Sequence, residues 1–434
     1  MKRLLYLSLM IAFAVACQGN VNDDPAGEDN AVRPEYEFLT GSGDEALTKA
    51  EQENVERIND FAFNLGNRIS EAKGNKGFVY SPVSMAFTLG MLSEGAAGQT
   101  REEICRALGY GMEGQQEVNE FCRKLMLIAG NSLIDGEELE IANAAVINTG
   151  FRLLESYRKS AKNYYDAEIA EKDFTKENVA GYINDWASEK THERITHVID
   201  EVPASTPAVF INALYFKASW MYPFADYLTR DRDFTGADGV VRQEKMMART
   251  DNMLYSTGDG FSMVTLPYGK ESFNPEADQT VQRSGNYAMS LLLPDEGVST
   301  GEILSRLDGV AFSRAKSSGY YPEVILTMPR FEAELDDDLK AVLEALGIRS
   351  MFGNADFSAM TQMPVFVDQV KQVANIAVDE YGTEAAAVTV AMMATDPGPG
   401  APRPKYVEFR CDRPFIFAIT EQTTGAILFL GSYR

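Results

Sequence analysis

Residues 379–395 read D-E-Y-G-T-E-A-A-A-V-T-V-A-M-M-A-T, and a segment dense in proline and glycine, residues 396–404, follows them. Because a strand projects alternate side chains to the same face, an extended segment over 383–391 would present one face of small, uncharged side chains. The stretch has too few large hydrophobic residues to anchor itself in a core, and the prolines after it oppose a continuing helix or central strand. On composition alone it also fits an Ala-rich helix or a flexible loop.

The flanking segments decide between these alternatives. An apolar segment, residues 365–378, precedes the stretch, and F-R-C-D-R-P-F-I-F, residues 409–417, follows it. In this setting E-x-G-T-E-A-A-A-x-T resembles the hinge of the reactive-centre loop in inhibitory serpins. The resemblance implies an exposed loop over residues 380–405, with a hinge made of Glu380, Gly382, Thr383, Glu384, Ala385, Ala386, Ala387 and Thr389. Thr383 is then the first residue expected to turn its side chain under the main sheet when the loop inserts.

The resemblance to serpins covers residues 48–434. The segment G-F-V-Y-S-P-V-S-M-A-F-T-L-G-M-L-S-E-G-A-A-G-Q-T-R-E-E-I, residues 77–104, is similar to the helix B region of that family. Its Ser81 is a helix cap, and Pro82 occupies the first helical position, where its missing N–H does no harm. The resemblance implies one domain of the α+β class with the serpin fold, which has three β-sheets, about eight or nine helices and an exposed reactive-centre loop.

Residue patterns predict the individual elements of this domain. Capping boxes at residues 48–51 and 100–103 each predict the start of a helix. Further helices are predicted over 178–194, 301–316 and 339–346, and strands over 139–149, 206–220, 234–247, 261–267, 287–294 and 323–331. Residues 269–286 are polar and predict an exposed loop, whereas the apolar runs 415–420 and 426–430 predict a hairpin buried on both faces.

Two further groups of residues take their roles from the resemblance. At the shutter, where the main sheet opens, the family places two serines, an asparagine and a histidine, which correspond here to Ser81, Ser84, Asn212 and Gln372. Glutamine donates and accepts as neutral imidazole does, so a hydrogen-bond network is expected to persist with altered tightness. At the breach, where the loop first enters, the matching residues are Trp220, Arg330 and Glu380. Arg330 replaces a common lysine, and its guanidinium could pair with Glu380 through two nitrogens. A large core residue would explain Trp220 equally well.

The amino terminus carries the pattern of an exported protein. Lys2 and Arg3 precede an apolar run that ends at residue 16 and is too short to span a bilayer. The run ends in A-V-A-C, which resembles the lipobox of bacterial lipoproteins and implies lipidation of Cys17; an ordinary signal peptide is the alternative. Residues 17–47 are polar and acidic and predict a flexible tether. The acidic stretch resembles a surface-export signal, so we expect an outer-membrane lipoprotein of a bacterial cell envelope, exposed at the surface.

Charge and composition exclude several classes of partner and chemistry. The 434 residues carry a formal net charge of -24, which opposes nucleic acid, anionic membrane surfaces and heparin-like cofactors as partners. With four cysteines and two histidines, we expect no metal site and no cofactor. His192 and His197 are five residues apart, about 140° around a helix, so they cannot share a metal ion there. No nucleophile constellation or carboxylate pair can be placed, so the chain is not expected to be an enzyme.

The three cysteines left after lipidation are Cys105, Cys122 and Cys411. Their odd number and irregular spacing predict buried free thiols, and a disulfide between Cys105 and Cys122 is the alternative.

The resemblance implies a monomeric inhibitor that traps a target protease as a covalent acyl-enzyme by loop insertion. Counting from the hinge points to a reactive bond near residue 396, but Pro397 would follow such a cut, so we expect the bond Thr395–Asp396, with Met393 and Ala394 as alternatives. These side chains favour elastase-, subtilisin- or cathepsin-G-like serine proteases, or papain-like cysteine proteases. Two rivals stay open: a non-inhibitory serpin used for binding, and a surface lipoprotein that binds glycan or acts as a hydrolase.

Overall fold

The computed structural model describes residues 47–111, 113–131, 137–273, 281–383 and 406–434. Nine α-helices occur in these ranges: α1 (Lys49–Lys73), α2 (Pro82–Gly95), α3 (Gly98–Ala107), α4 (Gln115–Asn131), α5 (Glu155–Tyr165), α6 (Val179–Lys190), α7 (Thr300–Arg306), α8 (Gly309–Ser317) and α9 (Lys340–Ala345). Two short 3₁₀ helices, η1 (Asp226–Leu228) and η2 (Ser350–Phe352), complete them. No helix in the described ranges is long and apolar enough to cross a membrane.

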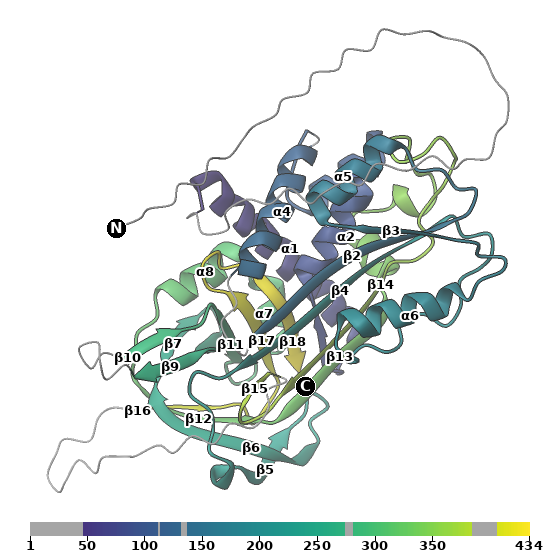
Figure 1. The fold of residues 1–434 in the computed structure, drawn as a ribbon. Helices are drawn as coiled ribbons and strands as arrows, with labels where there is room; N and C mark the ends of the chain where they lie inside the picture. The colour runs from purple at the N-terminus through teal and green to yellow at the C-terminus, as the bar shows by residue number, and fades with distance from the viewer. Residues whose placement is uncertain (1–46, 112, 132–136, 274–280, 384–405) are drawn as a thin grey trace, which may run out of the picture. The chain divides into compact units, whose positions relative to one another are not determined.

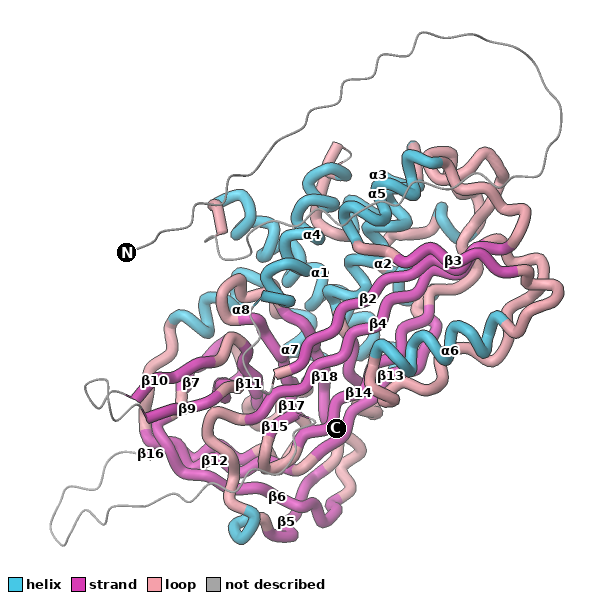
Figure 2. Tube along the Cα trace, in the orientation of Figure 1, coloured by secondary structure: helices cyan, strands magenta, loops and turns pink. Residues whose placement is uncertain are grey.

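The strands form three larger sheets and one separate hairpin (Figures 1 and 2). We call the first the main sheet; its order is β13 (Phe331–Asp338), β14 (Lys371–Val378), β15 (Gly382–Thr383), β4 (Ala208–Ser219), β2 (Glu138–Asn148) and β3 (Glu168–Lys172). The second sheet runs β1 (Phe78–Tyr80), β18 (Ile427–Tyr433), β17 (Phe415–Glu421), β11 (Tyr287–Pro294), β8 (Phe261–Pro267) and β7 (Leu254–Gly258). The third runs β16 (Tyr406–Arg410), β12 (Glu323–Pro329), β6 (Val241–Asn252) and β5 (Arg230–Thr235), and the hairpin pairs β9 (Lys270–Phe273) with β10 (Val281–Ser284).

Side-chain alternation along β2 places the main sheet between two hydrophobic layers. Ala145 and Ile147 belong to the large core, whereas Ala144 and Val146 pack with α6 in a separate cluster. Because successive side chains of a strand point to opposite faces, α6 covers one face of the sheet and the large core covers the other. In Figure 1, α6 lies beside β4 and runs roughly along the direction of the strands. Any segment added to the sheet beside β4 therefore enters a layer covered on both sides.

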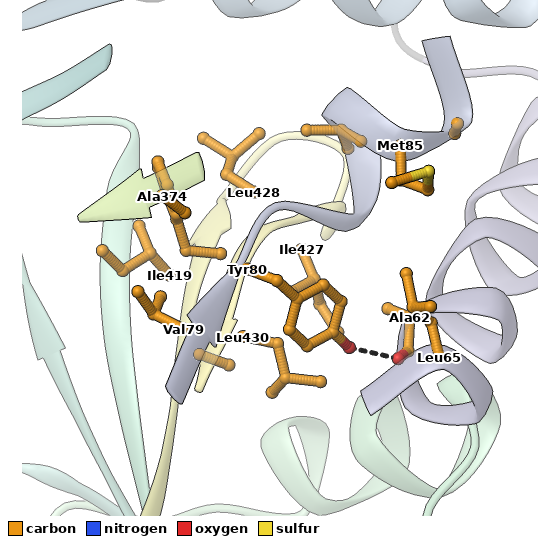
Figure 3. Packing of buried hydrophobic residues seen from close by; sticks show 14 of the residues in the cluster. Ala62, Leu65, Val79, Tyr80, Met85, Ala374, Ile419, Ile427, Leu428 and Leu430 are labelled. Atoms are coloured by element: carbon orange, nitrogen blue, oxygen red, sulfur yellow. Dashed lines mark hydrogen bonds between the residues drawn. The ribbon is translucent and has the colours of Figure 1, made fainter. Parts of the chain in front are cut away.

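The large core is built around α2 and the second sheet. Helix α2 is apolar on every side and buried along nearly its whole length, as expected of a helix at the centre of a domain. Figure 3 shows Tyr80 of β1 between α1 and β18, with its hydroxyl donating to the Ala62 carbonyl oxygen. The side chain of Ala374 from β14 lies in the same cluster. The main sheet thus rests on a core that sequence-distant elements build together.

Four predictions about elements are wrong, each for a local reason. The helix predicted over 301–316 is two helices, because Asp308 starts α8 by accepting a hydrogen bond from the Ala311 N–H at 2.6 Å. The loop predicted over 269–286 contains the β9–β10 hairpin. The helix predicted to reach 194 ends at Lys190, because His192 and Glu193 adopt positive φ angles.

The second capping box is the fourth error. Helix α3 begins at Gly98, and its Ala97 cap makes no side-chain hydrogen bond. Glu103 instead accepts hydrogen bonds from the N–H groups of Arg349 and Ser350, at 2.8 and 2.7 Å, and so stabilises the start of η2. The predicted C-terminal hairpin is confirmed, since β17 and β18 pair and are buried on both faces.

Candidate functional site: the hinge and the sheet opening

The hinge begins inside the main sheet. In β15, Gly382 pairs with Ser219 and Thr383 with Ala218 of β4, while Thr383 also pairs with Val378 of β14. Glycine is needed at 382, since a Cβ atom there would lie 2.1 Å from the Ala218 carbonyl oxygen. Residues 382 and 383 therefore lie between β4 and β14 at the end of the sheet where both strands finish, which we call the hinge end.

The position of Thr383 differs from the expectation, which was that its side chain enters the sheet only when the loop inserts. It is fully buried, and its Oγ1 lies 2.5 Å from the Tyr268 hydroxyl oxygen. Burial raises the pKa of Tyr268, so that hydroxyl stays neutral and able to donate or accept. The first hinge threonine is thus already held in the sheet of the intact protein.

From the hinge end toward the starts of β4 and β14, the main sheet is open within the described residues. The antiparallel ladder between β13 and β14 runs from Phe331 to Asp338, and the ladder between β2 and β4 from Glu138 to Ile147. Within the described residues no ladder joins the facing edges, 208–217 of β4 and 371–377 of β14. Such edges present unpaired backbone N–H and C=O groups to an incoming strand. We call this gap between β4 and β14 the seam.

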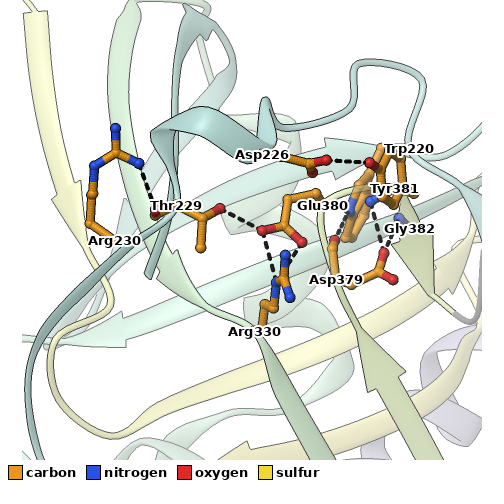
Figure 4. Close-up of polar contacts among 9 residues, drawn as sticks. All are labelled: Trp220, Asp226, Thr229, Arg230, Arg330, Asp379, Glu380, Tyr381 and Gly382. Atoms are coloured by element: carbon orange, nitrogen blue, oxygen red, sulfur yellow. Dashed lines mark hydrogen bonds and ion pairs between the residues drawn. The ribbon is translucent and has the colours of Figure 1, made fainter. Parts of the chain in front are cut away.

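Aromatic packing stabilises the hinge end of the seam. Trp220 follows β4, is almost fully buried and stacks on Tyr268 with ring centroids 4.4 Å apart. Its Nε1 donates to the Asp379 carbonyl oxygen at 2.9 Å, and its backbone N–H donates to the Tyr381 carbonyl oxygen at 2.8 Å (Figure 4). Trp220 is therefore both a core residue and a clamp on the turn that precedes the hinge.

A buried carboxylate anchors the same turn. Glu380 is fully buried, and the Arg330 Nε lies 2.8 Å from its Oε1 and 2.6 Å from its Oε2 (Figure 4). The Thr229 hydroxyl also donates to this carboxylate. The ion pair raises the pKa of Arg330. The pairing implied by the resemblance is thus present: Nε donates to Oε1 and lies within ion-pair distance of Oε2, which accepts no hydrogen bond among the described residues.

Asp379 and Tyr381 complete this turn. The Asp379 carboxylate accepts from the backbone N–H groups of Tyr381 and Gly382 at 2.8 and 3.2 Å. The Tyr381 hydroxyl donates to Asp226 at 2.6 Å (Figure 4). Sequence reasoning did not assign these contacts, although an Asp two residues before a backbone N–H is a common turn-forming arrangement.

The four shutter residues lie near the part of the seam that is farther from the hinge end, and they do not form one network. Gln372 Nε2 donates to the Ser81 carbonyl oxygen at 2.9 Å, and Ser81 Oγ caps α2 by accepting from the Ser84 N–H at 3.2 Å. Asn212 Nδ2 donates instead to Asn143 Oδ1 at 2.8 Å. Ser84 Oγ, Asn212 Oδ1 and Gln372 Oε1 are buried with no hydrogen-bond partner among the described residues. The expected single network is therefore not formed.

Asn143 is a site residue that sequence reasoning missed. It lies opposite Asn212 in the β2–β4 ladder, and its Nδ2 donates to the Tyr165 carbonyl oxygen at 2.7 Å. An asparagine inside the apolar run I-A-N-A-A-V-I was the available signal, because a buried amide needs polar partners.

The cysteines and histidines take no part in the site. Cys105, Cys122 and Cys411 are free and buried, so the alternative disulfide between the first two is not formed. Burial raises the pKa of the Cys122 thiol to about 12. His192 and His197 lie beyond α6, each 3.1 Å from a carboxylate, Glu140 and Asp200 respectively. The described residues contain no group of side chains that could hold a metal ion.

The remaining predicted positions lie outside the described residues: Cys17, Glu384, Ala385, Ala386, Ala387, Thr389, Met393, Ala394, Thr395 and Asp396.

Comparisons with known proteins support one family. Iripin-3 of Ixodes ricinus is 30% identical over 385 residues, which cover 86% of this chain and 92% of that protein. An uncharacterized serpin-like protein of Methanosarcina acetivorans is 29% identical and is covered to 96%, with 99% of this chain matched.

Two solved structures have a similar fold. Human thyroxine-binding globulin gives a TM-score of 0.75 at 26% identity, covering 88% of this chain and 98% of that one. The native thermophilic serpin tengpin gives 0.76 at 23% identity, covering 92% and 97%.

The family description "Serpin (serine protease inhibitor)" matches residues 56–434, which includes the main sheet, its seam and the hinge. This span is far more than half of the chain, and it contains all three larger sheets. The chain therefore belongs to the serpin family.

Proposed function

We propose that this serpin inhibits a serine protease as a suicide substrate, by inserting its reactive-centre loop into the seam. The observation that carries the proposal is the place of β15, whose two residues pair with β14 and β4. The loop follows Thr383 in the sequence, at one end of a gap whose two edges form no ladder with each other in the part of the chain that the structure describes. An incoming strand could extend β15 toward the starts of β4 and β14 and complete the sheet.

The chemistry follows from an ordinary acyl transfer. The serine hydroxyl of the protease attacks the carbonyl carbon of the reactive bond, transfers its proton to the leaving amine, and forms an ester as the peptide bond breaks. The cut releases the loop from β16, and the loop enters the seam with the protease attached. If loop insertion is faster than hydrolysis of the acyl-enzyme ester, the protease is displaced and distorted while it is still covalently attached. This chain supplies the substrate bond and the driving force.

The reactive bond is proposed at Thr395–Asp396, with Met393–Ala394 and Ala394–Thr395 as alternatives. Small and unbranched side chains suit elastase-, subtilisin- or cathepsin-G-like targets, and papain-like cysteine proteases are a further class. Proline at 397 would make a cut directly before it unfavourable.

A denaturing gel tests the inhibitory function. After mixing with pancreatic elastase or subtilisin, we expect a band of the combined mass that survives boiling and detergent. Mass spectrometry should find a released peptide that begins at residue 394, 395 or 396. Complete cleavage without a covalent band, across a panel of serine and cysteine proteases, would refute inhibition by trapping.

A non-inhibitory binding function is the second candidate. It is favoured by the likeness to thyroxine-binding globulin, whose structure was solved in complex with thyroxine. The same gel separates the two candidates, because a binding protein needs no covalent complex with a protease.

We also propose that Cys17 carries a lipid anchor and that the protein faces outward from a bacterial outer membrane. The lipobox-like A-V-A-C and the acidic segment after it support this proposal. Cys17→Ala should release the protein from the membrane fraction while leaving protease inhibition unchanged. Retention of the variant in washed membranes would contradict the anchor. Stable attachment requires more than one acyl chain, because a single chain binds only marginally.

A further inference from the structure

Three tyrosines are exposed on and beside the strand that follows the proposed reactive-centre loop. Tyr320, Tyr321 and Tyr406 are 56%, 69% and 54% exposed. Tyr406 is the first residue of β16 and comes directly after residue 405, where the proposed loop ends. In Figure 1, β16 lies next to β12 at the lower left. We call these three residues the tyrosine surface.

The register of the third sheet brings Tyr321 and Tyr406 to the same face. Strands β12 and β16 run parallel with Glu323 opposite Tyr406, so these two side chains point the same way. Tyr321 lies two residues before Glu323 and precedes a proline, which favours extended backbone, so its side chain points to that side as well. The neighbouring Val324 and Phe409 are buried, which places the tyrosines on the outer face of the sheet.

Tyr320 is held beside them by the second sheet. Its backbone N–H donates to the Tyr255 carbonyl oxygen at 3.0 Å, and its own carbonyl oxygen accepts from the Tyr255 N–H at 2.8 Å. The two rings meet edge to face with their centroids 5.8 Å apart. A tyrosine held on a strand has only two side-chain torsions left to order, so it offers a large contact area at a low entropy cost.

The place of the tyrosine surface favours a protein that is bound at the reactive-centre loop. Exposed tyrosines are typical of the residues that dominate protein interfaces. They also occur at membrane surfaces, but Glu323 and Glu408 flank Tyr406, and with the net charge of -24 they oppose an anionic lipid surface. About ten residues separate the proposed reactive bond from Tyr406, a span of at most about 35 Å. A protease domain of about 240 residues has a radius of gyration of about 18 Å, so a protease at that bond is within reach of the tyrosines.

We propose that the tyrosine surface contacts the target protease while the protease binds the uncut reactive-centre loop. This inference rests on the proposed inhibitory function and names a second contact for the same partner. Because the loop already holds the protease close, even a small second surface strengthens the encounter. Cleavage separates the loop from β16, so the contact acts before the acyl-enzyme forms. It therefore raises the rate of association and leaves the division between trapping and hydrolysis unchanged.

The rate constant for formation of the covalent complex with pancreatic elastase tests the contact. The double variant Tyr321→Ser, Tyr406→Ser should lower this rate constant at least about tenfold, since truncated tyrosines at interfaces commonly weaken binding by that much. The ratio of cleaved to trapped inhibitor and the Tm should stay unchanged. Phe366→Ser removes another exposed aromatic ring, 56% exposed and located before the start of β14, and should react as the unsubstituted chain does. Equal rate constants for the double variant and the unsubstituted chain would overturn the proposal.

Binding of elastase whose catalytic serine is replaced by alanine separates the tyrosine surface from inhibition. In a calorimetric titration, the double variant should bind this elastase at least about tenfold more weakly than the unsubstituted chain does. If that difference persists but active elastase forms no covalent complex, the inhibitory function fails and the contact stands. If the covalent complex forms and the two affinities are equal, the contact fails alone, and absence of binding by both chains would refute both.

Sedimentation over a range of protein concentrations checks the other occupant of such a surface, a second copy of this chain. We expect the same monomeric behaviour from the double variant and the unsubstituted chain. A self-association that only the double variant loses would assign the tyrosines to contacts between copies and would overturn the contact with the protease.

Discussion

At the residue scale, Thr383 connects the intact protein to its proposed mechanism. Its side chain is small enough to lie between β4 and β14, and its hydroxyl reaches the Tyr268 hydroxyl at 2.5 Å. A larger or charged side chain would have to leave this position before the loop could extend β15. The residue therefore affects both the start of insertion and the resting position of the hinge.

Thr383→Arg should turn the inhibitor into a substrate. Burying a guanidinium between the strands costs several kcal/mol unless it is paired or escapes to water. Loop insertion should therefore become slower than hydrolysis of the acyl-enzyme. Elastase should cut the variant at the same bond, and a denaturing gel should show little covalent complex.

Two matched changes control for charge and for the lost hydroxyl. Glu384→Arg adds the same group one position further, on the opposite face of an inserted strand, and should inhibit nearly as the unsubstituted chain does. Thr383→Val keeps the shape and removes only the contact with Tyr268, so it should retain most of the inhibition. Full inhibition by Thr383→Arg would mean that this strand does not enter the seam.

Lys316 is a partly buried cation outside the site. It lies on α8, its Nζ donates to Thr420 Oγ1 at 3.0 Å, and burial lowers its pKa from 10.5 to about 8 while nearby Glu421 partly opposes that shift. Below pH 8 the lysine is protonated in both states, so the destabilisation is fully present. Between pH 8 and 10.5 the native state releases its proton first, so the unfolded state binds more protons and stability rises with pH.

Lys316→Met should therefore stabilise the protein at neutral pH. The pKa difference corresponds to about 3 kcal/mol at pH 7, and the advantage of the variant should shrink as the pH approaches 10. Urea unfolding of both proteins at pH 7, 8.5 and 10 measures the difference between their free energies of unfolding. The titration of tyrosines and cysteines cancels in this difference, because both proteins contain the same tyrosines and cysteines. A constant difference across this range would show that Lys316 does not titrate as described.

At the element scale, apolar strands could be predicted from the sequence and short, contact-dependent elements could not. The strands predicted over 261–267 and 287–294 match β8 and β11, because their apolar runs are bounded by turns and are mostly buried in β8 and fully buried in β11. The break between α7 and α8 depends on Asp308, whose side chain is equally compatible with a helix interior until its contact with Ala311 forms. The end of α6 depends on the positive φ angles of two ordinary residues, His192 and Glu193.

The candidate site shows the same division. Trp220, Arg330, Glu380 and the four shutter residues were selected through the resemblance to serpins; the first three meet at the turn before β15, and the shutter residues lie on α2, β4 and β14 or cap α2. The sequence pattern could not predict that β15 is already formed, because its two residues are held by Ala218 and Val378 and not by their own propensity. It also could not predict that Asn212 pairs with Asn143, since that contact arises from the register of β2 against β4.

At the scale of the whole molecule, the seam makes the described fold incomplete. The edges of β4 and β14 that face it form no ladder with each other, although both strands are paired on their other sides. Ordering about fifteen residues of loop opposes insertion by about 1–2 kcal/mol per residue. Hydrogen bonds to two edges at once, about 0.5–1.5 kcal/mol each, and burial of the small-residue face between α6 and the core must exceed that cost. A cut at the proposed reactive bond would free the segment after Thr383 from its covalent connection to β16.

Cutting the reactive bond should therefore raise the Tm sharply, since the released loop can then fill the seam and pair with both edges. Differential scanning calorimetry of the intact and the elastase-cut protein measures the change. We expect an increase well above the 2–4 °C that about 1 kcal/mol produces in a domain of about 150–250 residues. Thr383→Arg, cut at the same bond, should gain much less, because its charge keeps the first residue of the new strand out of the sheet. A cut protein that melts at the temperature of the intact one would show that the seam stays open after cleavage, and trapping by strand insertion would then have no source of free energy.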